Sequence, residues 1–262
     1  MAGRWLIAGA VIVLAGACAD RSAPGGVGET NASPDVQESN RLRNASFEGE
    51  EASPWFDFAQ RNPKQWGPMA ISDERAREGE RSALLVLDSG ASGEAVRVLG
   101  VAQEIRGGGC PAYVSGWYFV EDWSRGCEAQ YLQVVAIALG GEAPEGLPNY
   151  QVARTLAGVT RAPFRILNRR FEIGGPPEPE VGRWVFFEVD LAAMFERRWG
   201  MVPDEGSTIR LFFEARYDGR DAERDPPARA RVYFDDLYAG SESRAGALPD
   251  PADASEVGDG EG

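Results

Sequence analysis

The sequence predicts an all-β fold, a sandwich or jelly roll that carries one short helix. Short runs of apolar, β-branched and aromatic residues recur along the chain, and turn-forming residues separate them. Hydrophobic residues make up 43% of the 262 residues, which is enough to fill the core between two packed sheets. Many strands with scattered turns and little helix are typical of sandwiches and jelly rolls.

The predicted strands follow one another through the middle of the chain. The run 83–87 comes after the Glu-Gly-Glu turn at 78–80, and 113–120 follows Pro111 and is rich in aromatic and β-branched residues. The run 131–139 is long and apolar. The complete set of predicted strands is 83–87, 95–105, 113–120, 131–139, 184–189, 208–217 and 229–238.

The segment 208–217 has the clearest alternation. Ile209 and Leu211 share one face of the predicted strand with Phe213, whereas Arg210 and Glu214 lie on the other face. Such alternation predicts a strand with one buried and one polar face.

Two segments depart from the strand pattern. Residues 191–199 have the spacing of a short helix. The stretch 140–180 contains six prolines and is predicted to be a long loop with at most one hairpin. Long loops on a rigid sandwich often carry function.

The first eighteen residues have the pattern of an export signal. Arg4 precedes the apolar run 5–14, which is too short to span a bilayer. The ending 14–18, Leu-Ala-Gly-Ala-Cys, resembles the lipobox of bacterial lipoproteins, and this resemblance implies cleavage before Cys18 and acylation of that residue. Ala15 stands where a large residue is usual, so the alternative is ordinary secretory cleavage close to Cys18.

These patterns divide the chain into four parts. They are a signal peptide at 1–17, a flexible tether at 18–40, a β-sandwich domain at 41–241 and a disordered acidic tail at 242–262. The protein is expected in a bacterial cell envelope, exported and held by a lipid anchor in the outer membrane or facing the periplasm.

Composition excludes several function classes. The chain has no histidine, which removes Ser-His-Asp and Cys-His triads and histidine-ligated zinc. Its formal charge of −14 repels phosphate backbones, so nucleic acid is not expected as a partner. Catalysis by two carboxylates passes this filter.

Two cysteines remain in the predicted domain. Cys110 and Cys127 flank a predicted strand and its loop, and an exported protein can form a disulfide. We predict a structural Cys110–Cys127 disulfide, and the alternative is a pair of buried thiols.

An ordered series of short motifs spans about residues 41–241, and each motif is weak alone. The motifs are Asn44-x-x-Phe47-Glu48, Trp66, Ala76-x-Glu78-Gly79-x-x-Ser82-Ala83-Leu84, Val101-Ala102-Gln103-Glu104-Ile105, Tyr113-Val114-Ser115-Gly116-Trp117, Gly182-Arg183-Trp184 and Tyr233-Phe234-Asp235-Asp236-Leu237. In this order they resemble a known family, the galactose-binding-like jelly-roll domains, and among them the carbohydrate-binding modules of the family 4, 9 and 22 type.

The resemblance implies a structural calcium ion that ties the first strand to the last. Carried over by position, its side-chain ligands would be Glu48 and Asp235, with Asp236 as the alternative to Asp235. Calcium prefers about six to eight oxygen ligands, which carboxylates and carbonyls supply. The alternative is that these acids lie in water or pair with arginines.

The resemblance also implies a sugar-binding face with aromatic platforms and polar side chains around them. Trp117 and Trp184 lie in apolar strands and are expected in the core. The alternative for the polar strand positions is a solvated outer sheet face. The candidate ligand-binding residues are three aromatics expected to be exposed, namely Trp123 in a loop, Tyr150 after Pro148-Asn149 and Trp199 at the end of the short helix, and the strand residues Gln133, Glu214 and Arg216.

Three function classes follow. The first is a membrane-tethered, non-catalytic lipoprotein that binds a polysaccharide or a cell-envelope glycan. The second is a structural or protein-interaction module without a sugar ligand. The third is a carboxylate-based glycosidase or lyase, for which Glu188-x-Asp190 matches part of a glucanase motif, but Ala193 stands where its last glutamate belongs.

Overall fold

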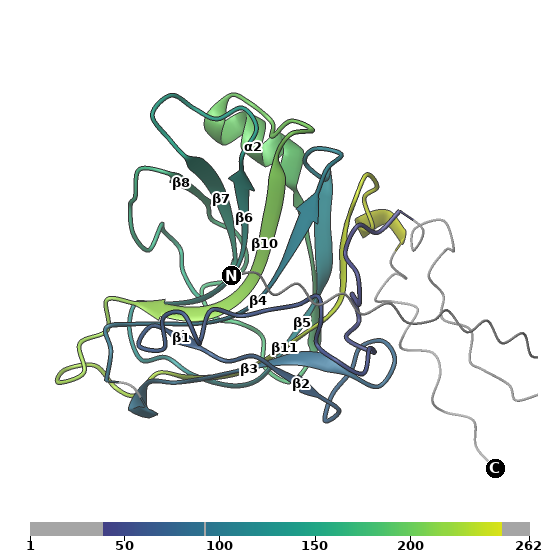
Figure 1. Ribbon diagram of the computed structural model, residues 1–262. Helices are drawn as coiled ribbons and strands as arrows, with labels where there is room; N and C mark the ends of the chain where they lie inside the picture. Colours follow the sequence, from purple (N-terminus) through teal and green to yellow (C-terminus); the bar gives the residue numbers. More distant parts are fainter. Residues whose placement is uncertain (1–38, 92, 248–262) are drawn as a thin grey trace, which may run out of the picture. The chain divides into compact units, whose positions relative to one another are not determined.

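The computed structural model describes residues 39–91 and 93–247, and within them eleven strands form two sheets (Figure 1). The predicted signal peptide, Cys18 and most of the predicted tether and tail therefore lie outside the described residues. No helix within the described ranges is long and apolar enough to cross a membrane.

The larger sheet has six strands. Its edge strands β1 and β8 run parallel to their neighbours β4 and β7, and the other pairs are antiparallel. Figure 1 shows β10 curving strongly through this sheet, with β7 and β8 standing on one side of the bend and β1 lying on the other. The spatial order is β1 (Trp66–Gly67), β4 (Val96–Arg106), β10 (Thr208–Asp218), β6 (Ala129–Leu139), β7 (Asn149–Ala157) and β8 (Arg169–Glu172).

The smaller sheet has five strands, all antiparallel. Two short 3-10 turns, η1 (Ser89–Ala91) and η2 (Ala245–Ala247), follow β3 and β11. The spatial order is β2 (Ala70–Ser72), β3 (Ser82–Asp88), β11 (Arg229–Gly240), β5 (Tyr113–Ser124) and β9 (Trp184–Asp190).

The core lies between the two sheets. Alternate residues of β10 point into it, as the sequence pattern predicts, and Phe213 is fully buried at its centre. The Phe213 ring lies within about 6 Å of the rings of Trp55, Phe187 and Phe234. Two sheets around one apolar core confirm the predicted all-β sandwich.

The single α-helix of the described residues, α2 (Leu191–Trp199), has the predicted bounds. The Asp190 carboxylate accepts a hydrogen bond from the backbone N–H of Ala193 and so caps the first turn. Gly200 ends the helix in a left-handed conformation with φ of 69°, which glycine adopts at little cost.

The stretch 140–180 differs from its prediction as a long loop. Residues 149–157 form β7, which pairs with β6, and β8 then lies parallel to β7, so the pair is no hairpin. The prolines of this stretch flank β7 but do not interrupt it, and their number hides a strand in which Tyr150 and Val152 face the core.

The predicted disulfide is wrong. Cys110 and Cys127 are both free thiols. The twelve residues of β5 stand between them, and an extended strand of that length spans about 40 Å, whereas a disulfide needs Cα atoms within about 7 Å. Burial raises the pKa of Cys110 to about 12 and also raises the pKa of Cys127, so neither is a reactive thiolate.

Candidate functional site

The outer face of the six-stranded sheet is the side that points away from the five-stranded sheet. Strand register places side chains from five neighbouring strands in one row across this face. We call this set the polar row. In order across the sheet its members are Glu104, Arg210, Ile137, Gln151 and Arg169.

One end of the polar row is held by charge pairs. Arg210 donates from Nε and Nη2 to Oε1 of Glu104, and Arg106 donates to Oε2 at 2.9 Å. These hydrogen bonds, that from Arg210 first, hold the pKa of Glu104 below its usual range. The Glu104 and Arg210 side chains keep 21% and 23% of their surface exposed, so both remain accessible to a ligand.

The other end of the polar row is a set of planar amides and a guanidinium. Arg169 donates to Oε1 of Gln151 at 2.8 Å, and Asn168 donates to Oδ1 of Asn149 at 2.7 Å. Asn149 lies next to the row on β7, and both asparagines are partly exposed. Fixed amide and guanidinium groups of this kind match the hydroxyl groups of a sugar.

Aromatic rings flank the polar row on the β4 side. The backbone of Phe56 pairs with Ala102 of β4, which places this segment along the free edge of the strand. Phe58 stacks on Phe212 of β10 with 5.6 Å between ring centroids, and Trp66 packs against both rings. The Arg210 guanidinium lies 5.7 Å from the Phe58 centroid, so rings and row form one continuous surface.

The predicted residues Gln133, Glu214 and Arg216 do come together on the outer face, next to the polar row. Gln133 donates to Oε2 of Glu214 at 2.5 Å, and Arg216 donates to the same oxygen at 3.2 Å. Arg216 also donates to Asp218, whose Oδ2 accepts from the Tyr131 hydroxyl at 2.7 Å. We call this set the buried network.

The buried network is covered, which the sequence interpretation does not anticipate. Gln133 and Glu214 are 0% and 2% exposed, and the Phe164 ring lies 5.4 Å from the Arg216 guanidinium. Burial lowers the pKa of Arg216, but Tyr131, Glu214 and Asp218 outweigh it and hold the pKa above its usual value. Oε1 of Gln133 has no hydrogen-bond partner among the described residues.

The three predicted aromatic platforms lie elsewhere. Tyr150 is fully buried, packed edge-on against Phe195 and Trp199, so its predicted exposure is wrong. Position 150 is the second residue of a core strand and not part of a loop. Trp199 donates from its indole to the Gln151 carbonyl, and Trp123 lies in β5 of the other sheet, where its indole donates to Glu178.

Phe56, Phe58 and Phe164 are the aromatic residues of this face that sequence reasoning missed. One signal for them was present. Phe212 alternates with Arg210 and Glu214 on the polar side of β10, and a large apolar ring there requires a cover. The sequence does not say which segment supplies that cover.

The acids at the two ends of the domain meet one turn of the chain. Asp235 is fully buried in β11, and its Oδ2 accepts from the backbone N–H groups of Arg77 and Glu78 at 2.5 and 3.0 Å. Glu48 accepts from the N–H groups of Glu80 and Arg81 at 2.9 and 2.8 Å. The turn 77–81 before β3 is thus held by carboxylates from both ends of the domain.

These carboxylates do not fit a calcium ion as they stand. Burial raises the pKa of Asp235 to about 7, while the N–H groups of Glu78, Arg77 and Asp236 lower it. Asp236 forms an ion pair with Arg244. Among the described residues no group of three or more acidic or cysteine side chains could hold a metal ion, and backbone N–H groups already donate to both oxygens of Asp235 and to one oxygen of Glu48.

Calcium nevertheless stays a prediction, which calorimetry tests. If calcium binds here, a chelator lowers the melting temperature of the full chain, because a ligand of the folded state alone stabilises it. Glu48→Ala then abolishes the difference. A melting curve that the chelator leaves unchanged contradicts calcium binding. The hydrogen bonds to the turn 77–81 then fully explain what these carboxylates do.

Comparisons with known proteins add likeness of fold. No family model matches the chain, and no curated protein matches it. A family 61 carbohydrate-binding module in complex with β-1,4-galactotriose has a TM-score of 0.38 and 16% identity, with 78% of this chain and 99% of that chain covered.

Two further solved structures are similar. The tandem family 22 carbohydrate-binding modules of Paenibacillus barcinonensis Xyn10C have a TM-score of 0.42 and 14% identity, with 80% of this chain and 52% of that chain covered. The enzymatically active domain of tailspike protein 4 from bacteriophage CBA120 has a TM-score of 0.40 and 10% identity, with 80% of this chain and 22% of that chain covered. Likenesses of this size carry no argument about ligand or activity.

Proposed function

We propose that this domain binds a glycan along the polar row of the outer face and does so without catalysis. The observation that carries the proposal is the row itself, in which Glu104, Arg210 and the amides of β7 cross the sheet beside the Phe58 ring. Aromatic rings next to fixed planar donors and acceptors are the chemistry that recognises sugars.

Each part of the row has a role in this proposal. The oxygens of Glu104 accept hydrogen bonds from sugar hydroxyls, and the Arg210 guanidinium donates to them. Next to the row on β7, the Asn149 amide nitrogen donates to a sugar hydroxyl, while its oxygen already accepts from Asn168 and Gln151. Ile137 provides an apolar floor at the middle of the row, against which the C–H face of a pyranose packs.

The state of the row's acid favours binding over hydrolysis. A glycosidase needs one carboxyl with a raised pKa as the general acid and a second carboxyl at a defined distance. The pKa of Glu104 is lowered, because Arg210 and Arg106 hold its ionised form. We therefore propose a non-catalytic module.

We further propose that the domain acts in a bacterial cell envelope, exported and tethered by a lipid on Cys18. The lipobox-like ending of residues 14–18 supports this address. A tether places the outer face where extracellular or cell-wall glycans are found.

Affinity gel electrophoresis tests the glycan proposal. Full-length chain is run through gels that contain galactan, xylan, β-glucan or polygalacturonate, and retention gives the affinity. For Arg210→Ala and Asn149→Ala we expect affinity for the retained glycan to fall about tenfold or more, because each removes hydrogen bonds made to the sugar.

Two variants on the other sheet serve as controls. Arg229→Ala removes an exposed arginine of β11, and Trp123→Ala removes a predicted platform of β5. We expect both to keep wild-type retention. Loss of retention in Trp123→Ala alone, with Arg210→Ala unaffected, would move the site to the other sheet and overturn the proposal.

One observation favours a second function, that of a protein-interaction module. Part of the outer face is closed by the protein itself, since Phe164 covers Arg216 and the Gln133–Glu214 pair is buried. A face filled in this way offers less room to a sugar. Absence of retention in every gel supports this second reading.

A further inference from the structure

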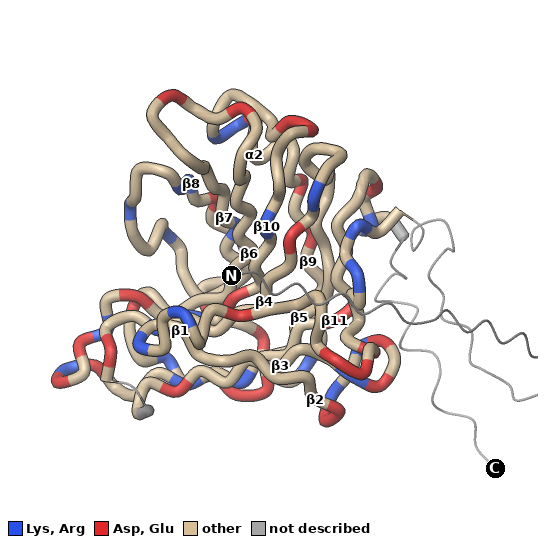
Figure 2. The backbone as a smooth tube through the Cα atoms, viewed as in Figure 1, with Lys and Arg blue, Asp and Glu red and all other residues tan. Residues whose placement is uncertain are grey.

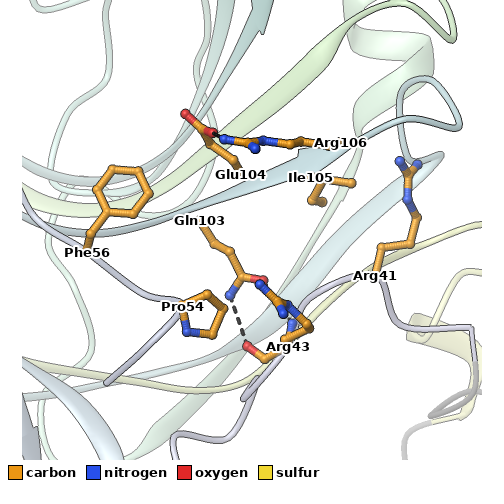
Figure 3. A pocket seen from close by; sticks show the side chains of 8 residues that line it. All are labelled: Arg41, Arg43, Pro54, Phe56, Gln103, Glu104, Ile105 and Arg106. Atoms are coloured by element: carbon orange, nitrogen blue, oxygen red, sulfur yellow. Dashed lines mark hydrogen bonds and ion pairs between the residues drawn. The ribbon is translucent and has the colours of Figure 1, made fainter. Parts of the chain in front are cut away.

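A cavity of about 640 Å³ lies at the free edge of β4, beside the polar row. Its size is within the range of about 300–1,000 Å³ that small-molecule sites occupy. Figure 3 shows Phe56 and Pro54 on one side, Arg41 on the opposite side, and the Glu104–Arg106 pair between them. Glu104 belongs to both the cavity and the polar row, so a ligand on the row can continue into the cavity.

The cavity is basic although the protein is acidic. Arg41, Arg43 and Arg106 line it, and Glu104 is the one acid among its lining residues. Arg210 also pairs with Glu104, which leaves the cavity with surplus positive charge. The whole chain has a formal charge of −14, and Figure 2 shows acidic and basic residues interspersed over its described part. A basic cavity on such a protein is a local departure from its average charge.

The arginines of the cavity differ in what holds them. Arg41 donates to the carbonyls of Gly107, Gly108 and Gly109, so its guanidinium is fixed in the wall. The backbone of Arg43 is held on both sides by Gln103, which accepts from its N–H and donates to its carbonyl at 2.9 Å each.

The Arg43 guanidinium itself is exposed, and no hydrogen bond or ion pair to it is recorded within residues 39–91 and 93–247. The Arg106 side chain is 79% exposed, and Glu104 is its one ion-pair partner in the part of the chain that the structure describes. The cavity therefore presents two guanidinium groups, those of Arg43 and Arg106, with N–H donors available to a ligand. The backbone of Arg43 is fixed by its hydrogen bonds to Gln103. Guanidinium groups bind carboxylates and sulfates through paired hydrogen bonds.

We propose that the cavity binds the anionic substituent of an acidic glycan through Arg43 and Arg106. This inference rests on the proposed glycan function and names its ligand class. The sugar that carries the carboxylate or sulfate lies against Phe56 and Pro54, and its neighbours continue along the polar row through Glu104. The negative charge of the protein as a whole opposes non-specific binding of polyanions, so retention of one requires the cavity.

The test uses three gels that distinguish a carboxylate ligand from a sulfate ligand and from a neutral sugar. Polygalacturonate carries carboxylates, dextran sulfate carries sulfates, and galactan carries neither. We expect stronger retention of the full-length chain by one of the two acidic polymers than by galactan, and retention that weakens as salt is added. Arg43→Ala and Arg106→Ala should each lower affinity for that polymer about tenfold, the cost of one charge-assisted hydrogen bond.

Matched variants keep the result interpretable. Arg43→Lys keeps the positive charge but loses the paired donors of the guanidinium, so its affinity for the acidic polymer should fall between those of wild type and Arg43→Ala. Arg229→Ala, on the other sheet, should match wild type. Both cavity arginines are exposed, so we expect unchanged melting temperatures.

The outcomes separate this inference from the proposed function. Equal retention by all three polymers, or affinity for the acidic polymer that Arg43→Ala and Arg106→Ala leave unchanged, overturns the inference. Galactan retention that still depends on Arg210 keeps the proposed function in that case. Retention by none of these three gels, and by neither xylan nor β-glucan, overturns both.

Discussion

Glu214→Ala is expected to destabilise the domain by about 3–5 kcal/mol, the usual cost of removing one partner from a buried ion pair. Glu214 is 2% exposed, and its Oε2 accepts from both Gln133 and Arg216. Without it, the amide of Gln133 loses its acceptor, and Asp218 alone balances a guanidinium that is 7% exposed. Gln133 already has one buried oxygen without a partner, so the network has no spare hydrogen bond to replace the loss.

Urea unfolding of Glu214→Ala beside Glu128→Ala measures this effect. Glu128 also forms an ion pair, with Arg161, but the side chains of both residues are more than 70% exposed. Exposed pairs contribute about 0–1 kcal/mol, so Glu128→Ala should remain near wild type. Equal and small losses of unfolding free energy in both variants would contradict the burial of this network.

Gly175→Ala is expected to be the most disruptive glycine substitution that we predict. Gly175 follows β8 with φ of +71°, and a Cβ there would lie 1.6 Å from the Leu156 carbonyl oxygen. The left-handed conformation costs about 1–2 kcal/mol for a residue other than glycine. Overlap with a strand carbonyl adds about 1–3 kcal/mol, since the backbone must move.

The position of this glycine explains why the backbone cannot move freely. The Thr155 hydroxyl and Gly174 exchange hydrogen bonds at 3.0 and 3.1 Å, and Gly158 donates to the Pro176 carbonyl. Displacing this part of the chain also disturbs β8 and the residues before it, among which Phe164 lies over Arg216 of the buried network.

Gly182→Ala is the matched control. Gly182 has φ of +88°, but a Cβ there would meet nothing within 4 Å, so this variant carries the conformational cost alone. Thermal unfolding should place Gly175→Ala clearly below Gly182→Ala. Coincident melting curves for the two variants would mean that Gly175 does not lie so close to the Leu156 carbonyl of β7.

The parts of the fold that short-range patterns encode were predictable from the sequence. Alternation in 208–217 identified the two faces of β10, and Asp190 and Gly200 bound a helix whose limits the residue pattern predicted. β7 was missed because prolines on either side outweighed its own apolar positions. The disulfide prediction failed because the strand predicted at 113–120, with a loop after it, is in fact β5 running on to Ser124, which keeps the two cysteines at opposite ends of the strand.

The site was predictable only in part, for a physical reason. Strand period puts Glu214 and Arg216 on one face, and the pairing of β6 with β10 brings Gln133 beside Glu214. What covers that face depends on contacts between distant segments, such as Phe58 on Phe212 and Phe164 over Arg216. No local pattern specifies such contacts, so the polar row and its cavity appear only in three dimensions.

Hydrogen exchange of the full-length chain with and without bound glycan tests the central claim most directly. The probes are a galacturonate hexamer and, in parallel, a galactose hexamer. We predict that at least one of them slows exchange in β4, in β7 and β10, and in the segment 56–66, while β3 and β11 of the five-stranded sheet are unaffected. Protection confined to the five-stranded sheet, or none with either probe, would contradict glycan binding on the outer face.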